Sequence, residues 1–139
     1  MNAPDPRTVG RTMTEDTSTF DAFRRAEALV AQRRPLDALA MLAVVLEAEP
    51  NAPSVLLLAG RAYLGSAQLQ RAEAAFRRVL ELDPTDHYAM FALGRTLQRQ
   101  SRFTEALTQL RLAVAMNPLP EYQEALGEIN ARIALRRTD

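Results

Sequence analysis

The residues of this chain that could support acid–base, nucleophilic or metal chemistry are few and scattered. The 139 residues include one histidine, His87, between Asp86 and Tyr88, and no cysteine. Catalysis or metal binding by His87 would need a nucleophile or further ligands at a matching spacing, and neither is present. The sequence also has no phosphate-cradling glycine loop and no glycine-flanked serine. We therefore predict no catalytic residue, no metal site, no cofactor and no enzymatic activity, and a structural or solvent-exposed role for His87.

The charged residues balance each other. The chain has 17 basic and 17 acidic residues and a formal net charge of zero, and every basic residue is an arginine. The nucleotide composition of the source genome explains the absence of lysine, although arginine is also the better bidentate partner for carboxylates. Balanced charge without a run of one sign predicts that the protein does not bind nucleic acid.

One set of residue types recurs along the chain every 34 residues. Gly60 and Gly94, for example, are 34 residues apart, as are Pro84 and Pro118. The three copies consist of Ala26, Leu29, Ala38, Leu42 and Pro50, then Gly60, Tyr63, Ala72, Phe76 and Pro84, then Gly94, Leu97, Ala106, Leu110 and Pro118. Small, large apolar and proline positions at this period indicate a helical solenoid.

Each copy is typical of two antiparallel helices. In the second copy, apolar residues recur every three or four positions over residues 54–63 and again over residues 69–80, and residues 64–68 form a short connection. Gly60 and Gly94 lie in the middle of helices, where glycine costs about 1 kcal/mol relative to alanine. We therefore expect the partner helix to approach each glycine closely, with large side chains such as Phe76 and Leu110 filling the adjacent space.

Prolines mark the ends of the predicted helices. Pro50, Pro84 and Pro118 end each unit because proline cannot continue a helix and disfavours helical geometry in the residue before it. Pro53 and Pro120 lie where the first turn of the next helix should begin, which proline tolerates.

The recurring residues resemble the tetratricopeptide repeat. The resemblance covers three units, residues 19–52, 53–86 and 87–120. It implies an all-α fold, a right-handed α-solenoid of three antiparallel helix pairs. For this family it also implies binding of other proteins through the concave groove, and it does not imply an activity.

In this family the first helix of each pair lines the groove, so residues 34 apart lie side by side along it. Three rows follow from this spacing: Phe23, Leu57 and Phe91; Phe20, Ser54, Tyr88 and Tyr122; and Glu27, Arg61 and Arg95, with Arg99 one turn beyond Arg95. We predict partner binding by Phe20, Phe23, Glu27, Leu57, Arg61, Tyr88, Phe91, Arg95 and Arg99. Such a groove suits a peptide or helix with bulky apolar anchors and acidic groups. Two structural explanations stay open: Glu27 pairs with Arg61 across adjacent helices, and Phe20 and Phe23 cover the end of the first unit.

The sequence also departs from the family pattern. The turn inside each unit usually carries a glycine, whereas the matching positions hold Arg33, Ala67 and Ser101, which predicts tight or strained turns. Family members that hold the acidic C-terminus of heat-shock chaperones use a clamp of lysines and asparagines. The matching positions are Phe23, Glu27, Leu58, Tyr88 and Ala92, so that function is not supported.

The two ends of the chain are expected to differ. Residues 1–18 are polar, contain prolines and show no periodicity, which predicts a disordered lead. Residues 120–137 predict a capping helix that covers the last pair with a stripe of Tyr122, Leu126, Ile129 and Ile133. Within it, Glu128 and Arg132 have the spacing of a favourable ion pair.

These features together predict one domain over residues 19–137. The longest apolar run, residues 38–46, is too short to span a bilayer, and no signal peptide is visible, so we expect a cytoplasmic protein that does not bind membranes. The favoured function is a protein-binding adaptor or small chaperone. The alternatives are a self-associating scaffold, which would form a homo-oligomer, and a regulatory subunit of another complex.

Overall fold

The prolines of the chain mark the helix ends of the computed structural model, which describes residues 6–138 and the side chains of residues 18–137. The described residues form seven helices: α1 (Pro6–Ala31), α2 (Pro35–Ala48), α3 (Pro53–Gly65), α4 (Leu69–Leu82), α5 (His87–Arg99), α6 (Phe103–Met116) and α7 (Pro120–Thr138). Helices α3 and α7 begin at Pro53 and Pro120, as predicted. Helices α2, α4 and α6 each end two residues before Pro50, Pro84 or Pro118.

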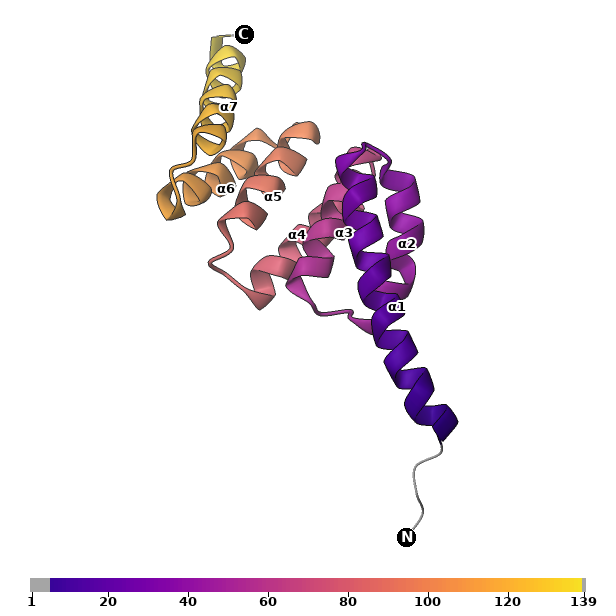
Figure 1. Cartoon of the computed structure of the whole chain (residues 1–139). Coiled ribbons are helices and arrows are strands. Elements are labelled where there is room, and N and C mark those ends of the chain that lie inside the picture. Colours follow the sequence, from indigo (N-terminus) through magenta and orange to yellow (C-terminus); the bar gives the residue numbers. More distant parts are fainter. Residues whose placement is uncertain (1–5, 139) are drawn as a thin grey trace.

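The helices pack as successive antiparallel pairs. Helices α1 and α2, α3 and α4, and α5 and α6 form hairpins; each hairpin contacts the next, and α7 packs on α6. Figure 1 shows the chain passing from α1 at one end of the stack to α7 at the other. The leading helices also contact one another in the order α1, α3, α5 and α7, so they share one face. The predicted all-α solenoid of three helix pairs and a closing helix is confirmed.

The close helix contact predicted at the glycines is present. A Cβ atom added to Gly60 would lie 2.5 Å from Cε1 of Phe76, and one added to Gly94 would lie 2.8 Å from Cδ2 of Leu110. Phe76 and Leu110 are completely buried. Each large side chain therefore occupies the space that a side chain at the glycine would need, which explains why glycine is placed inside these two helices.

The turns inside the three pairs carry the predicted strain. Arg33, Ala67 and Ser101 have φ angles of 59°, 60° and 60°, in the left-handed region that favours glycine. At the second turn the amide of Gln68 donates to the carbonyl of Tyr63 at 2.8 Å, and equivalent bonds join Arg34 to Leu29 and Arg102 to Leu97. This six-to-one bond defines a Schellman motif, which requires a left-handed residue at its end.

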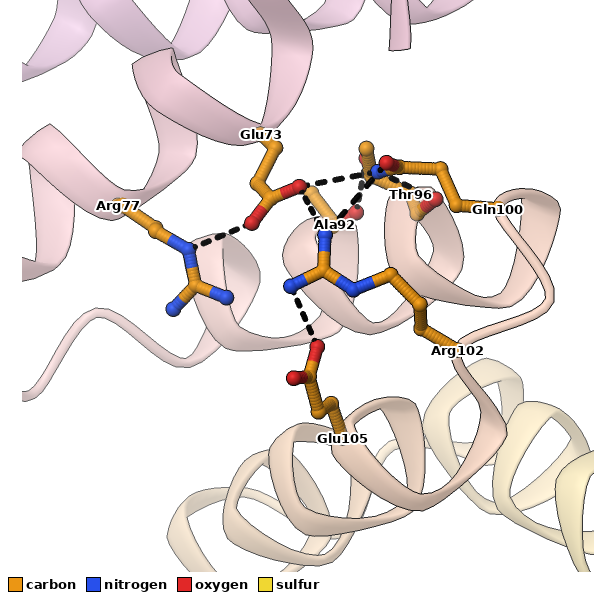
Figure 2. A network of polar contacts seen from close by, with 7 residues as sticks. All are labelled: Glu73, Arg77, Ala92, Thr96, Gln100, Arg102 and Glu105. Atoms are coloured by element: carbon orange, nitrogen blue, oxygen red, sulfur yellow. Dashed lines mark hydrogen bonds and ion pairs between the residues drawn. The ribbon is translucent and has the colours of Figure 1, made fainter. Parts of the chain in front are cut away.

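A polar network joins the second and third pairs (Figure 2). Glu73 on α4 accepts hydrogen bonds from Arg77 at 2.9 Å, from Gln100 at 3.1 Å and from Arg102 at 2.6 Å. Arg102, at the start of α6, also pairs with Glu105 at 2.6 Å. Partial burial by itself raises the pKa of Glu73, but the hydrogen bonds from Arg77, Gln100 and Arg102 outweigh it and lower the pKa below 4.5.

The N-terminal segment differs from the expectation of a disordered lead. Helix α1 begins at Pro6, so residues 6–18 belong to it, whereas residues 1–5 lie outside the described part of the chain. Once a helix is nucleated, each further residue adds one hydrogen bond at low cost. The part of α1 that packs on α2 supplies this nucleus, which the polar composition of the segment could not reveal.

Helix α7 lies against the third pair through its apolar stripe. Tyr122, Ala125 and Ile129 are fully buried, and Leu126 and Ile133 are partly buried. The hydroxyl group of Tyr122 lies 2.8 Å from Nδ1 of His87, so the single histidine of the chain links the start of α5 to α7. Among the described residues, no helix is both long and apolar enough to cross a membrane.

Candidate binding groove

The apolar row of predicted groove residues lies on three successive leading helices. Phe23 on α1 packs against the core of the first pair. Leu57 on α3 and Phe91 on α5 pack against the central core, which consists of buried residues of α4, α5, α6 and α7. All three side chains are partly buried, so each contributes to the core and still reaches the surface. Phe20 is 63% exposed, which does not support the alternative that it covers the end of the first unit.

Tyr88 and Phe91 continue this surface toward α7, and the buried ring of Tyr122 lies behind Phe91. The rings of Phe91 and Tyr122 stack with centroids 4.7 Å apart, and the rings of Tyr88 and Phe91 lie 6.2 Å apart in a tilted arrangement. Burial raises the pKa of the Tyr88 hydroxyl. Tyr88 and Phe91 therefore form an aromatic wall, and their ring contacts have the offset and tilted geometries that aromatic pairs prefer.

Arg61 faces this wall without an internal partner. Its side chain is exposed, and in the described part of the chain it makes no hydrogen bond and no ion pair. Its charge acts on Tyr88, where it opposes the effect of burial on the pKa. Glu27 lies 3.8 Å from Arg24 of the same helix, so the structure does not show the predicted alternative of a pair between Glu27 and Arg61.

The other two predicted arginines do have internal partners. Arg95 donates to Glu128 on α7 at 2.7 Å and lies over the ring of Phe91 at 5.9 Å. Arg99 donates to the carbonyl oxygen of Leu64 at 2.9 Å. The ion pair predicted between Glu128 and Arg132 is not formed, because Glu128 reaches across to α5 instead.

A cleft of about 910 Å³ opens beside these two arginines. It is lined by Leu64, Phe91, Arg95, Gln98, Arg99, Ser101, Phe103, Glu128, Ala131 and Arg132. Of the predicted residues, the structure brings Phe91, Arg95 and Arg99 together here. Phe20, Phe23, Glu27, Leu57, Arg61 and Tyr88 lie outside this cleft, on α1, α3 and the first turn of α5.

The part of the cleft formed by α7 was not among the residues predicted from the sequence. Leu64, Gln98 and Arg132 are successive members of another row with a spacing of 34 residues. That row was a usable signal, since α7 occupies the position of a further leading helix. Within the described residues, no group of three or more His, Cys, Asp or Glu side chains is arranged to hold a metal ion.

Comparisons with known proteins agree with this architecture. Two profiles described as Tetratricopeptide repeat match the chain, one over residues 23–87 and one over residues 64–129. No curated protein matches it. The TPR domain of Sgt2 from Aspergillus fumigatus has a similar structure, with a TM-score of 0.81 and 16% identity, over 99% of this chain and 85% of that chain.

Two further similar structures were solved with peptides. The first TPR of Spaghetti (RPAP3), bound to the HSP90 peptide SRMEEVD, has a TM-score of 0.78 and 16% identity, over 85% of this chain and 94% of that chain. The second TPR domain of human RPAP3, in complex with the HSP70 peptide SGPTIEEVD, has a TM-score of 0.75 and 14% identity, over 84% of this chain and 98% of that chain. The recurring residues, the stacked helix pairs and the two profile matches show that this chain belongs to the tetratricopeptide repeat family.

Proposed function

We propose that this protein is an interaction module that binds a partner peptide or helix through the face shared by α1, α3, α5 and α7, as an adaptor or small chaperone. The observation that carries the proposal is the position of Arg61. It is an exposed guanidinium without an internal partner, one turn from Leu57 and close to the partly buried Tyr88. Arginine and aromatic side chains contribute most of the binding energy in protein interfaces.

Similar domains support this proposal at the level of the binding mode. The Spaghetti and RPAP3 domains were solved with peptides that end in EEVD. This chain has apolar or acidic residues, such as Phe23 and Glu27, at positions where the chaperone-binding clamp needs lysine and asparagine. We therefore propose a ligand with one or two bulky apolar anchors and a carboxylate that reaches Arg61, rather than a chaperone tail.

The test uses a random 12-residue peptide library displayed on phage and selected on the full chain. Selected peptides are synthesised, and their binding to the parent protein and to Arg61→Ala is measured by fluorescence anisotropy. Loss of a central interface arginine costs 2 kcal/mol or more, so we expect at least about 30-fold weaker binding. Arg111→Ala, an exposed change on α6 outside the groove, is the control. Peptides that bind Arg61→Ala as tightly as the parent would remove the groove assignment.

Self-association is a second candidate, and exposed apolar side chains on the first pair favour it. Phe20 on α1 is 63% exposed, and Leu36 and Val44 on α2 are 67% and 57% exposed. Sedimentation velocity over a range of concentrations tests this candidate. A stable dimer that Leu36→Ser and Val44→Ser dissociate would support a scaffold, whereas a monomer at all concentrations would exclude it.

A further inference from the structure

Two arginines of α7 share one aromatic ring. The guanidinium carbons of Arg132 and Arg136 lie 5.3 Å and 5.0 Å from the ring centroid of Phe103, the first residue of α6. Both arginines are exposed, and neither forms an ion pair within the described part of the chain. Like charges one helical turn apart repel each other, so an anion bound beside Arg132 and Arg136 would stabilise this pair.

A third arginine adds to this positive charge. Arg99 lines the same cleft as Arg132, and its hydrogen bond goes to the uncharged carbonyl of Leu64. A second cleft of about 450 Å³, lined by Ser101, Phe103, Arg132, Leu135 and Arg136, adjoins the first and shares three of its residues. Arg95 is neutralised by Glu128. Three guanidiniums without a carboxylate partner therefore line the two adjoining clefts beside the turn between α5 and α6, although the whole chain has no net charge.

We propose that this double cleft, between the α5–α6 turn and α7, binds an acidic amphipathic helix of a partner protein. Two carboxylates of that helix would pair with Arg132 and Arg136, within reach of Arg99. One large apolar side chain would lie against Phe91 and Leu64. This inference rests on the proposed function and assigns a second contact to the α7 part of that face, which is outside the three repeats.

The spacing of the arginines argues for a helix as the ligand. Arg132 and Arg136 are four residues apart on α7, which corresponds to about 6 Å along the helix axis. Two carboxylates four residues apart on a partner helix have the same separation. The cation–π contacts with Phe103 restrain both guanidinium groups, so less conformational entropy is lost when they bind carboxylates.

The same observations argue against nucleic acid as the ligand. Single strands bind by stacking bases on exposed aromatic faces. Phe103 is 7% exposed and is covered by two guanidiniums, and Phe91 is stacked on Tyr122.

The test uses a defined probe. It is an alanine-based helical peptide, blocked at both ends, with two glutamates four residues apart and one leucine on the same face. Its control peptide carries glutamines in place of the glutamates. Binding to the full chain is measured by fluorescence anisotropy at low and high salt. We expect the glutamate peptide to bind at least about tenfold more tightly than the control, and high salt to weaken it, because exposed charge pairs are screened.

Matched variants assign the binding to the two arginines. The double variant Arg132→Gln with Arg136→Gln should bind the glutamate peptide at least about tenfold more weakly. The control double variant, Arg71→Gln with Arg111→Gln, removes the same charge outside both clefts and should bind this peptide as tightly as the parent. Arg132→Lys with Arg136→Lys keeps the charge and should restore part of the affinity. Circular dichroism checks that each variant is folded. A purely structural role of the arginines would not make binding depend on the glutamates of the probe.

Three outcomes would overturn the inference: equal binding of the two peptides, unchanged binding by Arg132→Gln with Arg136→Gln, or full displacement of the probe by a single-stranded RNA at equal concentration. These outcomes are separate from the test of the proposed function. Library peptides that depend on Arg61, together with a probe that does not bind, would reject only the α7 site. A probe that depends on Arg132, together with library peptides that ignore Arg61, would reject only the groove.

Discussion

Gly60 and Phe76 are in direct contact across the second helix pair, so that the phenyl ring occupies the place of a Cβ atom on Gly60. The distance from that place to Cε1 of Phe76 is 2.5 Å, and the ring is completely buried. A methyl group at Gly60 would have to displace this completely buried ring. The repeat therefore depends on the absence of a side chain at this position.

Gly60→Ala should destabilise the protein. Alanine has the higher helix propensity, by about 1 kcal/mol, but the clash with Phe76 should outweigh this gain and leave a net loss of about 1–2 kcal/mol. Gly127→Ala on α7 is the matched control, since nothing lies within 4 Å of the added atom, and it should stabilise the protein by up to about 1 kcal/mol. Urea unfolding measures both changes, and a Gly60→Ala protein as stable as the parent would contradict the packing argument.

Ala67→Gly should stabilise the turn between α3 and α4. Ala67 has a φ of 60°, a conformation that costs an L-residue roughly 1 kcal/mol and that glycine adopts freely. After the greater entropy of glycine in the unfolded chain is subtracted, we expect a gain of about 0.5 kcal/mol. Ala74→Gly, at an exposed position inside α4, should instead lose about 1 kcal/mol. Opposite shifts in melting temperature would verify the prediction, and a loss in both would count against it.

Glu73→Gln should lower the free energy of unfolding at neutral pH. It should also make that free energy less dependent on pH in the acidic range. The side chain of Glu73 is 15% exposed and accepts bonds from three residues, so the charge is worth about 1–2 kcal/mol. Because the folded-state pKa lies below 4.5, this contribution is present above pH 4.5 and is lost as the pH falls through the lowered pKa. Unfolding free energies of both proteins should therefore converge as the pH falls below 4.5.

Glu81→Gln is the control for that measurement. Glu81 also pairs with an arginine, Arg78, but its side chain is 65% exposed. Exposed pairs contribute roughly 0–1 kcal/mol, so this change should have little effect at any pH. If Glu73→Gln and Glu81→Gln had the same small effect, the network of Figure 2 would not stabilise the contact between the second and third pairs.

Ile129→Ala should weaken the attachment of α7 to the third pair. Ile129 is fully buried against the central core, and removing such a side chain typically costs about 2–5 kcal/mol. Ile133→Ala, four residues later and only partly buried, should cost less. Hydrogen exchange of α7 amides provides the measurement. Equal exchange in both variants and the parent would mean that α7 does not depend on this contact.

The sequence by itself determined the repeat, the helix pairs and their turns. These features were predictable because they depend on local chemistry repeated every 34 residues: prolines at helix ends, glycines at Gly60 and Gly94, and non-glycine residues such as Ala67 at the tight turns. Each copy of the pattern supports the others, so the prediction did not depend on any single residue. The helical structure of residues 6–18 was the exception, since nothing in their local composition indicates it.

The tertiary structure alone decided which charged groups meet. From the sequence, Glu27 could pair with Arg61 and Glu128 with Arg132, but in the structure Glu27 lies near Arg24 and Glu128 binds Arg95. A long charged side chain can form ion pairs with several partners at similar free energy. Which ion pair forms therefore depends on how closely the neighbouring helices approach. The approach of α7 to α5 therefore neutralises Arg95, while Arg61, Arg132 and Arg136 form no ion pair within the described part of the chain.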